Sequence, residues 1–145
     1  MSDSTIHSVI LASPGHTPGP GAGPSHPPVV VMLHGWMHSL ENLRGLGDVL
    51  AERFTVHILD LPGFGESPPL APDAGLDDYV SALDGYFNAK GISRAILFGH
   101  SFGGRVSIKF AAKFPEKVER LILNNTPALP RRRTVAQKLR VTAIR

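Results

Sequence analysis

The 145-residue sequence contains no cysteine, which excludes disulfide bonds and thiolate metal sites. It also has no apolar run that approaches the ~20 residues needed to cross a bilayer. Its first residues, Met-Ser-Asp-Ser-Thr, lack the basic and apolar segments of a secretory signal. We therefore expect a soluble, cytoplasmic protein that has no membrane partner.

Acidic residues are absent from the segment 131–145, whereas the rest of the chain contains all twelve of them. Six of the fifteen Lys and Arg residues lie in this segment, so the formal net charge of +3 reflects the end of the chain. Basic tails can bind polyanions. No aromatic platform or nucleic-acid motif accompanies this one, so we do not expect nucleic-acid binding and interpret the segment as a solvated amphipathic helix.

The remaining composition is that of one folded domain. Hydrophobic residues make up 42% and charged residues 19% of the chain, which suits a packed core and argues against wholesale disorder. The length is sufficient for one compact domain and too short for two. The segment 13–28 is rich in Pro and Gly, so it is predicted to be a loop.

Short apolar runs alternate with segments of helical periodicity. The apolar runs predict strands at 4–12, 29–33, 54–61, 94–99 and 118–125. The helical periodicity covers residues 40–50, 76–87 and 102–114. Strands that alternate with helices form βαβ units. The sequence therefore predicts an α/β fold with a mostly parallel sheet flanked by helices.

Three motifs follow predicted strands, at the carboxyl ends where such folds place their chemistry. They are His34-Gly35-Trp36, the run from Asp60 to Ser67, and Gly99-His100-Ser101-Phe102-Gly103-Gly104. The third contains the pattern Gly-x-Ser-x-Gly between a strand and a helix, which is the context that a nucleophile elbow requires. The alternative role for Ser101 is that of a helix N-cap.

With these motifs in this order, residues 29–130 resemble the α/β-hydrolase superfamily, in particular its esterases, C–C hydrolases and perhydrolases. The resemblance implies that Ser101 is the nucleophile. It also implies that the backbone N–H groups of Phe102 and Trp36 form the oxyanion hole. Phe102 opens a helix, whose N-terminal N–H groups and dipole favour negative charge. A small-molecule acyl substrate, without a cofactor or metal, is the corresponding expectation.

The other motif residues are expected to support this site. Gly35 would shape the loop of the oxyanion hole, and His34 would hydrogen-bond locally rather than transfer protons. Asp60 is expected to fix loops by accepting backbone N–H bonds, a role that we favour over catalysis. Trp36 could also line a pocket or join the core.

The glycines around Ser101 are expected to permit a tight turn. Gly99 and Gly103 would let neighbouring backbone approach where a Cβ would clash, and Gly104 would let the helix pack close to the strand. The side chain of His100 is expected to point away from Ser101.

The catalytic acid and histidine of this family follow the serine in the chain, but no histidine follows Ser101 here. The acids after Ser101, Glu116 and Glu119, are predicted to be surface carboxylates at the amino end of the last strand. Some relatives carry the acid where this chain has Asn124 and Asn125, and asparagine cannot supply a negative charge. His38 is the least implausible substitute base.

The segment 127–145 resembles the entry into a cap or lid, with 131–145 as the start of a cap helix. We therefore expect residues 1–145 to be a single, partial α/β-hydrolase domain, a fragment that lacks the C-terminal strands and leaves its last strand as an exposed edge. The first functional hypothesis is a serine hydrolase acting on an ester, amide or carbon–carbon bond next to a carbonyl. The second is a non-catalytic module that binds small acyl compounds or a protein. Polyanion binding through the tail is the weakest of the three, and the oligomeric state is left open.

Overall fold

A five-stranded sheet forms the centre of the computed structural model, which describes residues 6–12 and 27–127. The strands are β1 (Ser8–Leu11), β2 (Val29–Leu33), β3 (Thr55–Leu59), β4 (Ala95–His100) and β5 (Val118–Asn124). Their spatial order is β1-β3-β2-β4-β5, and only the pairing of β1 with β3 is antiparallel. The predicted α/β fold with a mostly parallel sheet is confirmed.

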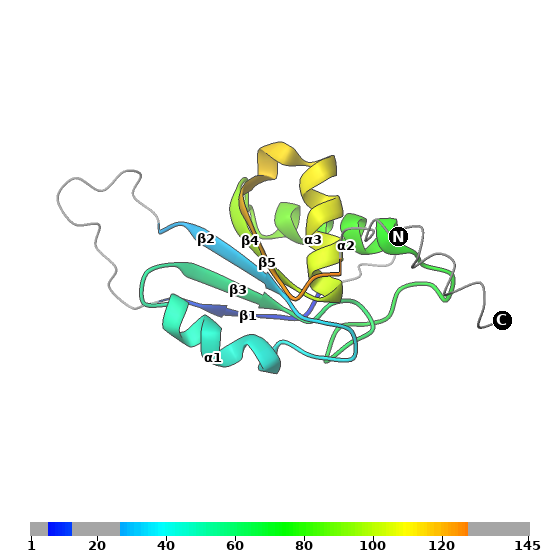
Figure 1. The fold of residues 1–145 in the computed structure, drawn as a ribbon, viewed down its shortest axis with the longest axis horizontal. Helices are drawn as coiled ribbons and strands as arrows, with labels where there is room; N and C mark the ends of the chain where they lie inside the picture. The colour runs from blue at the N-terminus through cyan, green and yellow to red at the C-terminus, as the bar shows by residue number, and fades with distance from the viewer. Residues whose placement is uncertain (1–5, 13–26, 128–145) are drawn as a thin grey trace, which may run out of the picture.

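Helices cover both faces of the sheet (Figure 1). Helix α1 (Glu41–Leu50) lies on one face, and α2 (Leu76–Ala89) and α3 (Phe102–Lys113) lie on the other. A short 3-10 turn, η1 (Pro115–Lys117), joins α3 to β5. Among the helices of the described residues, none has the length and apolar character needed to span a membrane.

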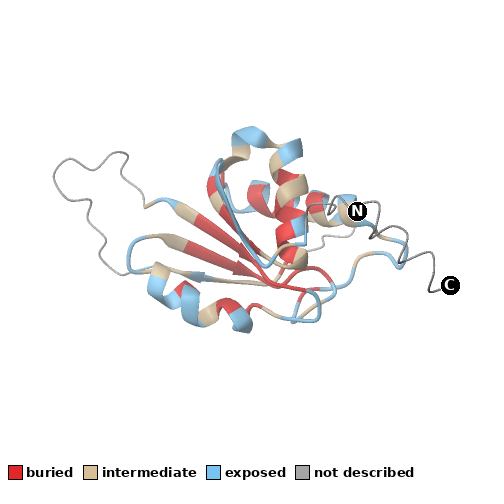
Figure 2. Ribbon diagram, in the orientation of Figure 1, coloured by how far each residue is buried: buried red, intermediate tan, exposed pale blue. Residues whose placement is uncertain are grey.

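The two faces of the sheet bury separate apolar clusters. Alternate residues of β2 point to opposite sides, so that Val31 and Leu33 pack beneath α2 and α3 while Val30 and Met32 pack beneath α1. Figure 2 shows the central strands as buried and the outer surfaces of the helices as exposed. Continuous apolar runs therefore occur in the central strands because both faces of these strands are covered.

The observed elements differ from the predicted ones mainly at their ends. Strand β3 stops at Leu59, whereas the apolar run predicted a strand to Leu61. Asp60 and Leu61 already belong to the following loop, where the Leu61 N–H donates to the ring of His34. The predicted loop at 13–28 and the predicted cap helix at 131–145 lie largely or wholly outside the described residues.

Strand β5 is an edge strand, as expected. It pairs with β4 on one side, and most of its residues are exposed, including Leu121, Ile122 and Leu123. The other edge of the sheet is formed by β1, which is only four residues long. The β5 edge thus exposes three large apolar side chains, whereas the β1 edge exposes one, Ile10.

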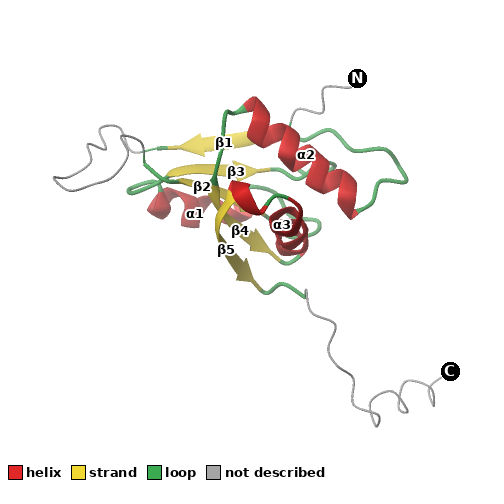
Figure 3. Cartoon of the chain, turned by 90° about the horizontal axis from the view of Figure 1, so that it is seen from above, coloured by secondary structure: helices red, strands yellow, loops and turns green. Residues whose placement is uncertain are grey.

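The parallel strands β2, β3 and β4 point in the same direction (Figure 3). The loops that follow them therefore meet at the carboxyl ends of these strands, and the loops carry the three sequence motifs.

Candidate active site

Ser101 lies on a strained turn between β4 and α3. Its backbone has φ 50° and ψ −112°, a conformation that is uncommon for a residue with a side chain. Its N–H donates to the Asn124 carbonyl at 3.0 Å, which holds the turn against the end of β5. Although Ser101 occupies the N-cap position of α3, its side chain makes no capping hydrogen bond, so the N-cap alternative is not supported.

The glycines of the same motif are sites of close backbone approach. A Cβ on Gly99 would lie 2.5 Å from the Gly104 Cα, and one on Gly103 would lie 2.5 Å from the carbonyl oxygens of Leu33 and His34. A Cβ on Gly104 would collide with the side chain of Thr126. Side chains at these positions would therefore push α3 away from the sheet.

The loop after β2 packs directly against the turn that carries Ser101. The Gly103 N–H donates to the His34 carbonyl at 3.0 Å, which joins this loop to the first turn of α3. A Cβ placed on Gly35 would lie 3.4 Å from the Ser101 Cβ. Two motifs that are more than sixty residues apart in the sequence are thus in contact.

Two backbone N–H groups beside Ser101 have no hydrogen-bond partner within the part of the chain that the structure describes. They belong to Trp36, in the loop after β2, and to Phe102, the first residue of α3. These are the two groups that the family resemblance proposes as the oxyanion hole. Unpaired donors of this kind are available to a ligand.

Aromatic rings surround these two residues. The indole of Trp36 packs edge to face against Phe64 at 5.0 Å and against Phe102 at 5.1 Å. The ring of Phe102 also packs edge to face against Tyr79 of α2. Because Trp36 is 56% exposed, its indole forms part of the surface rather than of the core.

His34 is fully buried, and both of its ring nitrogens are hydrogen-bonded. Its Nε2 accepts from the Leu61 N–H at 2.9 Å, and its Nδ1 lies 2.7 Å from the Gly35 carbonyl oxygen. Burial holds the pKa of His34 below its ordinary value of 6.5, although the bond to Gly35 and the charge of Asp60 act in the opposite direction. A neutral ring with both nitrogens occupied is not positioned to accept a proton from Ser101.

Asp60 is buried at the end of β3 and binds three donors. The backbone N–H groups of Leu40 and Glu66 donate to its carboxylate at 2.8 Å and 3.1 Å, and the Nδ1 of His7 lies 2.8 Å from the same group. Burial alone would raise the pKa of Asp60, but these hydrogen bonds outweigh it and hold the pKa below its ordinary value. This arrangement suits a carboxylate that fixes loops.

The five histidines that the structure describes all have neighbours other than the Ser101 hydroxyl. His7 binds Asp60, His34 binds Gly35, and His57 binds the hydroxyl of Tyr86. The rings of His38 and His100 stack in parallel at 5.9 Å, and the Nδ1 of His100 is buried without a hydrogen-bond partner. The described residues thus show no histidine hydrogen-bonded to the serine.

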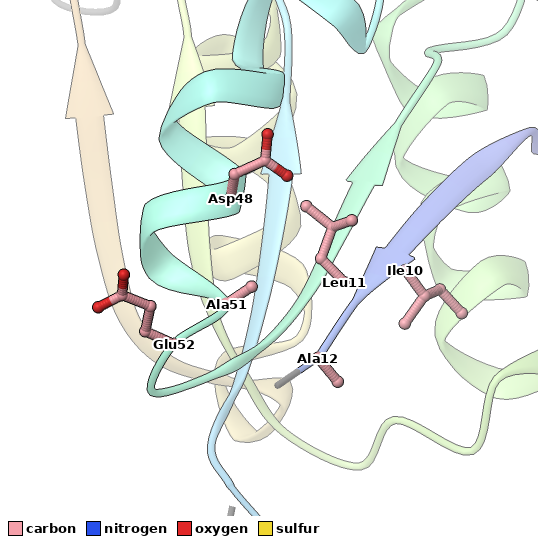
Figure 4. Close-up of a pocket in the computed structure, with 6 residues that line it drawn as sticks. All are labelled: Ile10, Leu11, Ala12, Asp48, Ala51 and Glu52. Carbon is pink, nitrogen blue, oxygen red and sulfur yellow. The ribbon is translucent and has the colours of Figure 1, made fainter. Parts of the chain in front are cut away.

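Other candidate binding features lie elsewhere or were not found. Among the described residues, no group of three or more His, Asp or Glu side chains could hold a metal ion. An open groove of about 340 Å³ lies between β1 and α1 (Figure 4). Its lining residues are Ile10, Leu11, Ala12, Asp48, Ala51 and Glu52. Leu11 pairs with Val56 near the start of β3, so the groove lies at the amino ends of the parallel strands, whereas Ser101 lies at their carboxyl ends.

Sequence reasoning missed the contacts that hold the motif loops in place. His7 precedes β1, yet its ring binds Asp60 and its N–H donates to Ser67. Leu61 lies within an apolar run, and its N–H binds the ring of His34. Neither residue belongs to a recognisable catalytic pattern, so nothing in the sequence marked these roles.

Comparisons with known proteins identify relatives along most of the chain. The murine (lyso)-N-acylphosphatidylethanolamine lipase is 34% identical over 115 residues, which are 77% of this chain and 34% of the lipase. The pimeloyl-[acyl-carrier protein] methyl ester esterase of Shewanella woodyi is 40% identical over 93 residues, which are 64% of this chain and 34% of the esterase. The matched segment thus spans about a third of each of these relatives.

Solved structures show the same fold. A marine microorganism esterase superposes with a TM-score of 0.72 at 22% identity, covering 96% of this chain and 49% of the esterase. An ancestral haloalkane dehalogenase superposes with a TM-score of 0.72 at 27% identity, covering 86% of this chain and 39% of the dehalogenase. A family profile described as the alpha/beta hydrolase fold matches residues 28–141. On this evidence the chain belongs to the alpha/beta hydrolase fold family.

Proposed function

We propose that the chain carries the nucleophile and the oxyanion hole of a serine hydrolase that cleaves an ester, amide or carbon–carbon bond next to a carbonyl. The observation that supports this most is the strained backbone of Ser101, at φ 50°, beside two backbone N–H groups without partners among the described residues. Strain of this kind persists where the surrounding structure enforces it, and it is frequent at active sites.

The proposed chemistry is the attack of the Ser101 hydroxyl on the carbonyl carbon of a small acyl compound. A bond forms between Oγ and that carbon while the π electrons of the carbonyl move to its oxygen, which becomes an oxyanion, and the serine proton passes to water. The intermediate then breaks its bond to the leaving group, which takes up a proton from water, and an acyl-serine remains. The N–H groups of Trp36 and Phe102 would hold the oxyanion. Each such donor can change the rate by about 10²–10³-fold.

The base is the part of this machinery that the chain does not supply in a recognisable form. No histidine follows Ser101 in the sequence, and none of the described histidines is hydrogen-bonded to it. We therefore propose that the chain on its own is at most a slow hydrolase. Catalysis that survives the loss of the base relies on the oxyanion hole and on substrate binding.

A fluorophosphonate probe tests this proposal, because it phosphonylates a reactive serine. We expect slow labelling of the purified chain at Ser101, located by peptide mass spectrometry, and no labelling of Ser101→Ala. Ser93→Ala, which removes the hydroxyl of an exposed loop serine, is the matched control and should label like the wild type. The rate of p-nitrophenyl acetate hydrolysis should likewise be equal in the wild type and Ser93→Ala and should be lost in Ser101→Ala. Equal behaviour of the wild type and Ser101→Ala would reject autonomous serine catalysis.

Because no described histidine is hydrogen-bonded to Ser101, a second candidate is a non-catalytic module that binds small acyl compounds or a protein. This module would bind an ester equally well with serine or alanine at position 101. An affinity that is unchanged in Ser101→Ala, together with absent labelling, would favour it over the hydrolase.

A further inference from the structure

The orientation of one peptide plane decides whether the Trp36 N–H can serve the oxyanion hole. The Gly35 carbonyl and the Trp36 N–H belong to the same peptide unit, which is planar and places the two groups on opposite sides. Anything that fixes the direction of the carbonyl therefore fixes the direction of the N–H.

Two donors converge on the Gly35 carbonyl oxygen. The Nδ1 of His34 lies 2.7 Å from it, and the His38 N–H donates to it at 3.2 Å. The His34 contact is the shorter of the two, and it involves a side chain that is completely buried. Because the carbonyl faces these donors, the Trp36 N–H points the other way and has no partner among the described residues.

The backbone of Leu61 decides which nitrogen of His34 carries the proton. The Leu61 N–H donates to Nε2 at 2.9 Å, so Nε2 must present a lone pair and the single proton of the neutral ring lies on Nδ1. The resulting Nδ1–H is the group that can donate to the Gly35 carbonyl. A loop after β3 thus determines a hydrogen bond in the loop after β2.

The same segment is fixed relative to Ser101. The His34 carbonyl accepts from the Gly103 N–H in the first turn of α3, and Gly35 packs against the Ser101 side chain. A rotation of the Gly35–Trp36 peptide is therefore the one change that would turn the Trp36 N–H away while leaving its neighbours in place.

We propose that His34 is a positioning residue that orients the Trp36 N–H toward the oxyanion by holding the Gly35 carbonyl. This inference rests on the proposed function, because it assigns a role within the oxyanion hole. It goes further by naming the chain of contacts, from Leu61 through His34 and Gly35 to Trp36. His34 then affects the reaction without touching the substrate.

Two substitutions separate the two hydrogen bonds of His34. In His34→Asn the side-chain amide can take the place of Nδ1 and donate to Gly35, but it does not reach Leu61. In His34→Gln the side-chain oxygen can take the place of Nε2 and accept from Leu61, but no donor faces Gly35. Both variants remove a buried ring, so each serves as the packing control for the other.

The sequence contains a single tryptophan, so selective ¹⁵N-tryptophan labelling gives one backbone amide signal. After reaction with a fluorophosphonate, we expect the Trp36 amide proton to shift downfield in the wild type and in His34→Asn, and to stay in place in His34→Gln. The labelling rate of Ser101 should fall roughly ten- to a hundredfold in His34→Gln and less in His34→Asn. If the labelling rate falls equally in both variants, and by an amount that follows their loss of stability, the proposal is overturned.

A measurement on the unmodified protein separates this proposal from the proposed function. The imidazole ¹⁵N shifts of His34 should show a proton on Nδ1, with scalar coupling across the hydrogen bond to the Gly35 carbonyl. A proton on Nε2 or a missing coupling would overturn the positioning role, even if Ser101 is labelled. An unlabelled Ser101 with the expected His34 signals would reject the hydrolase function while leaving the peptide orientation established.

Discussion

His57 shows how a single buried polar residue is accommodated in this core. Its Nδ1 lies 2.8 Å from the Tyr86 hydroxyl, which in turn donates to the Ser8 hydroxyl at 2.9 Å. Burial, and to a smaller extent the charge of Lys90, lowers the pKa of His57 below 6.5. One tyrosine hydroxyl thus joins β3, α2 and β1 through neutral hydrogen bonds.

Removal of that hydroxyl should destabilise the protein. We expect Tyr86→Phe to lower the free energy of unfolding by about 1–3 kcal/mol, because it leaves the buried His57 ring without its partner. Denaturant titration would measure this loss. Tyr79→Phe is the control on the same helix, since Tyr79 packs through its ring against Phe102, and it should change stability by less than about 0.5 kcal/mol. Equal effects of the two substitutions would contradict a special role for the Tyr86 hydroxyl.

At the scale of the element, α1 contains two glycines with different surroundings. A Cβ on Gly47 would lie 2.5 Å from the Ile58 Cδ1, whereas a Cβ on Gly45 would have no atom within 4 Å. Gly47 faces the sheet and permits close packing on β3, and Gly45 faces solvent. By helix propensity alone, the two glycines are equally unfavourable.

The two glycines should therefore respond oppositely to alanine. Gly45→Ala is expected to raise the free energy of unfolding by about 0.5–1 kcal/mol, because alanine restricts the unfolded chain and favours the helix. Gly47→Ala is expected to lower it by about 1–3 kcal/mol, because the added methyl group overpacks the contact with Ile58. Thermal and denaturant unfolding of both variants would test this pair. A stabilising Gly47→Ala would show that α1 can move away from the sheet at little cost.

At the scale of the whole molecule, β5 is the main unprotected feature. Among residues 6–12 and 27–127 it has a strand partner on one side only, and it exposes Leu121, Ile122 and Leu123, which lie on both faces of the sheet. Exposed apolar edge strands promote pairing between molecules. The fold thus brings the residues around Ser101 together and at the same time leaves a surface that favours self-association.

A charge in the middle of this edge should reduce self-association. We expect Ile122→Lys to lower the apparent mass in light scattering at high protein concentration, because a charged side chain disfavours pairing between edge strands. Val49→Lys is the matched control, since Val49 is also exposed, at 64%, but lies on α1. If both variants reduce association equally, general surface hydrophobicity rather than the β5 edge drives it.

Local patterns in the sequence were sufficient to predict the order of strands and helices, the mostly parallel sheet and the gathering of three motifs at the carboxyl ends of the strands. These features depend on local patterns such as apolar runs, helical spacing and glycines around a serine, which are visible within a few residues. The end of β3 was not visible in this way, since Leu61 continues the apolar run but lies in the loop, where its N–H donates to the ring of His34.

The contacts between atoms of different motifs became visible only in the folded structure. The binding of His7 to Asp60, the contact of the His34 ring with Leu61 and the different environments of Gly45 and Gly47 all involve groups from separate elements. Such contacts depend on how the elements pack in three dimensions, and a single sequence does not reveal them. The pattern around Ser101 therefore predicted a strained turn, while packing determined which N–H groups beside it have no partner in the described part of the chain.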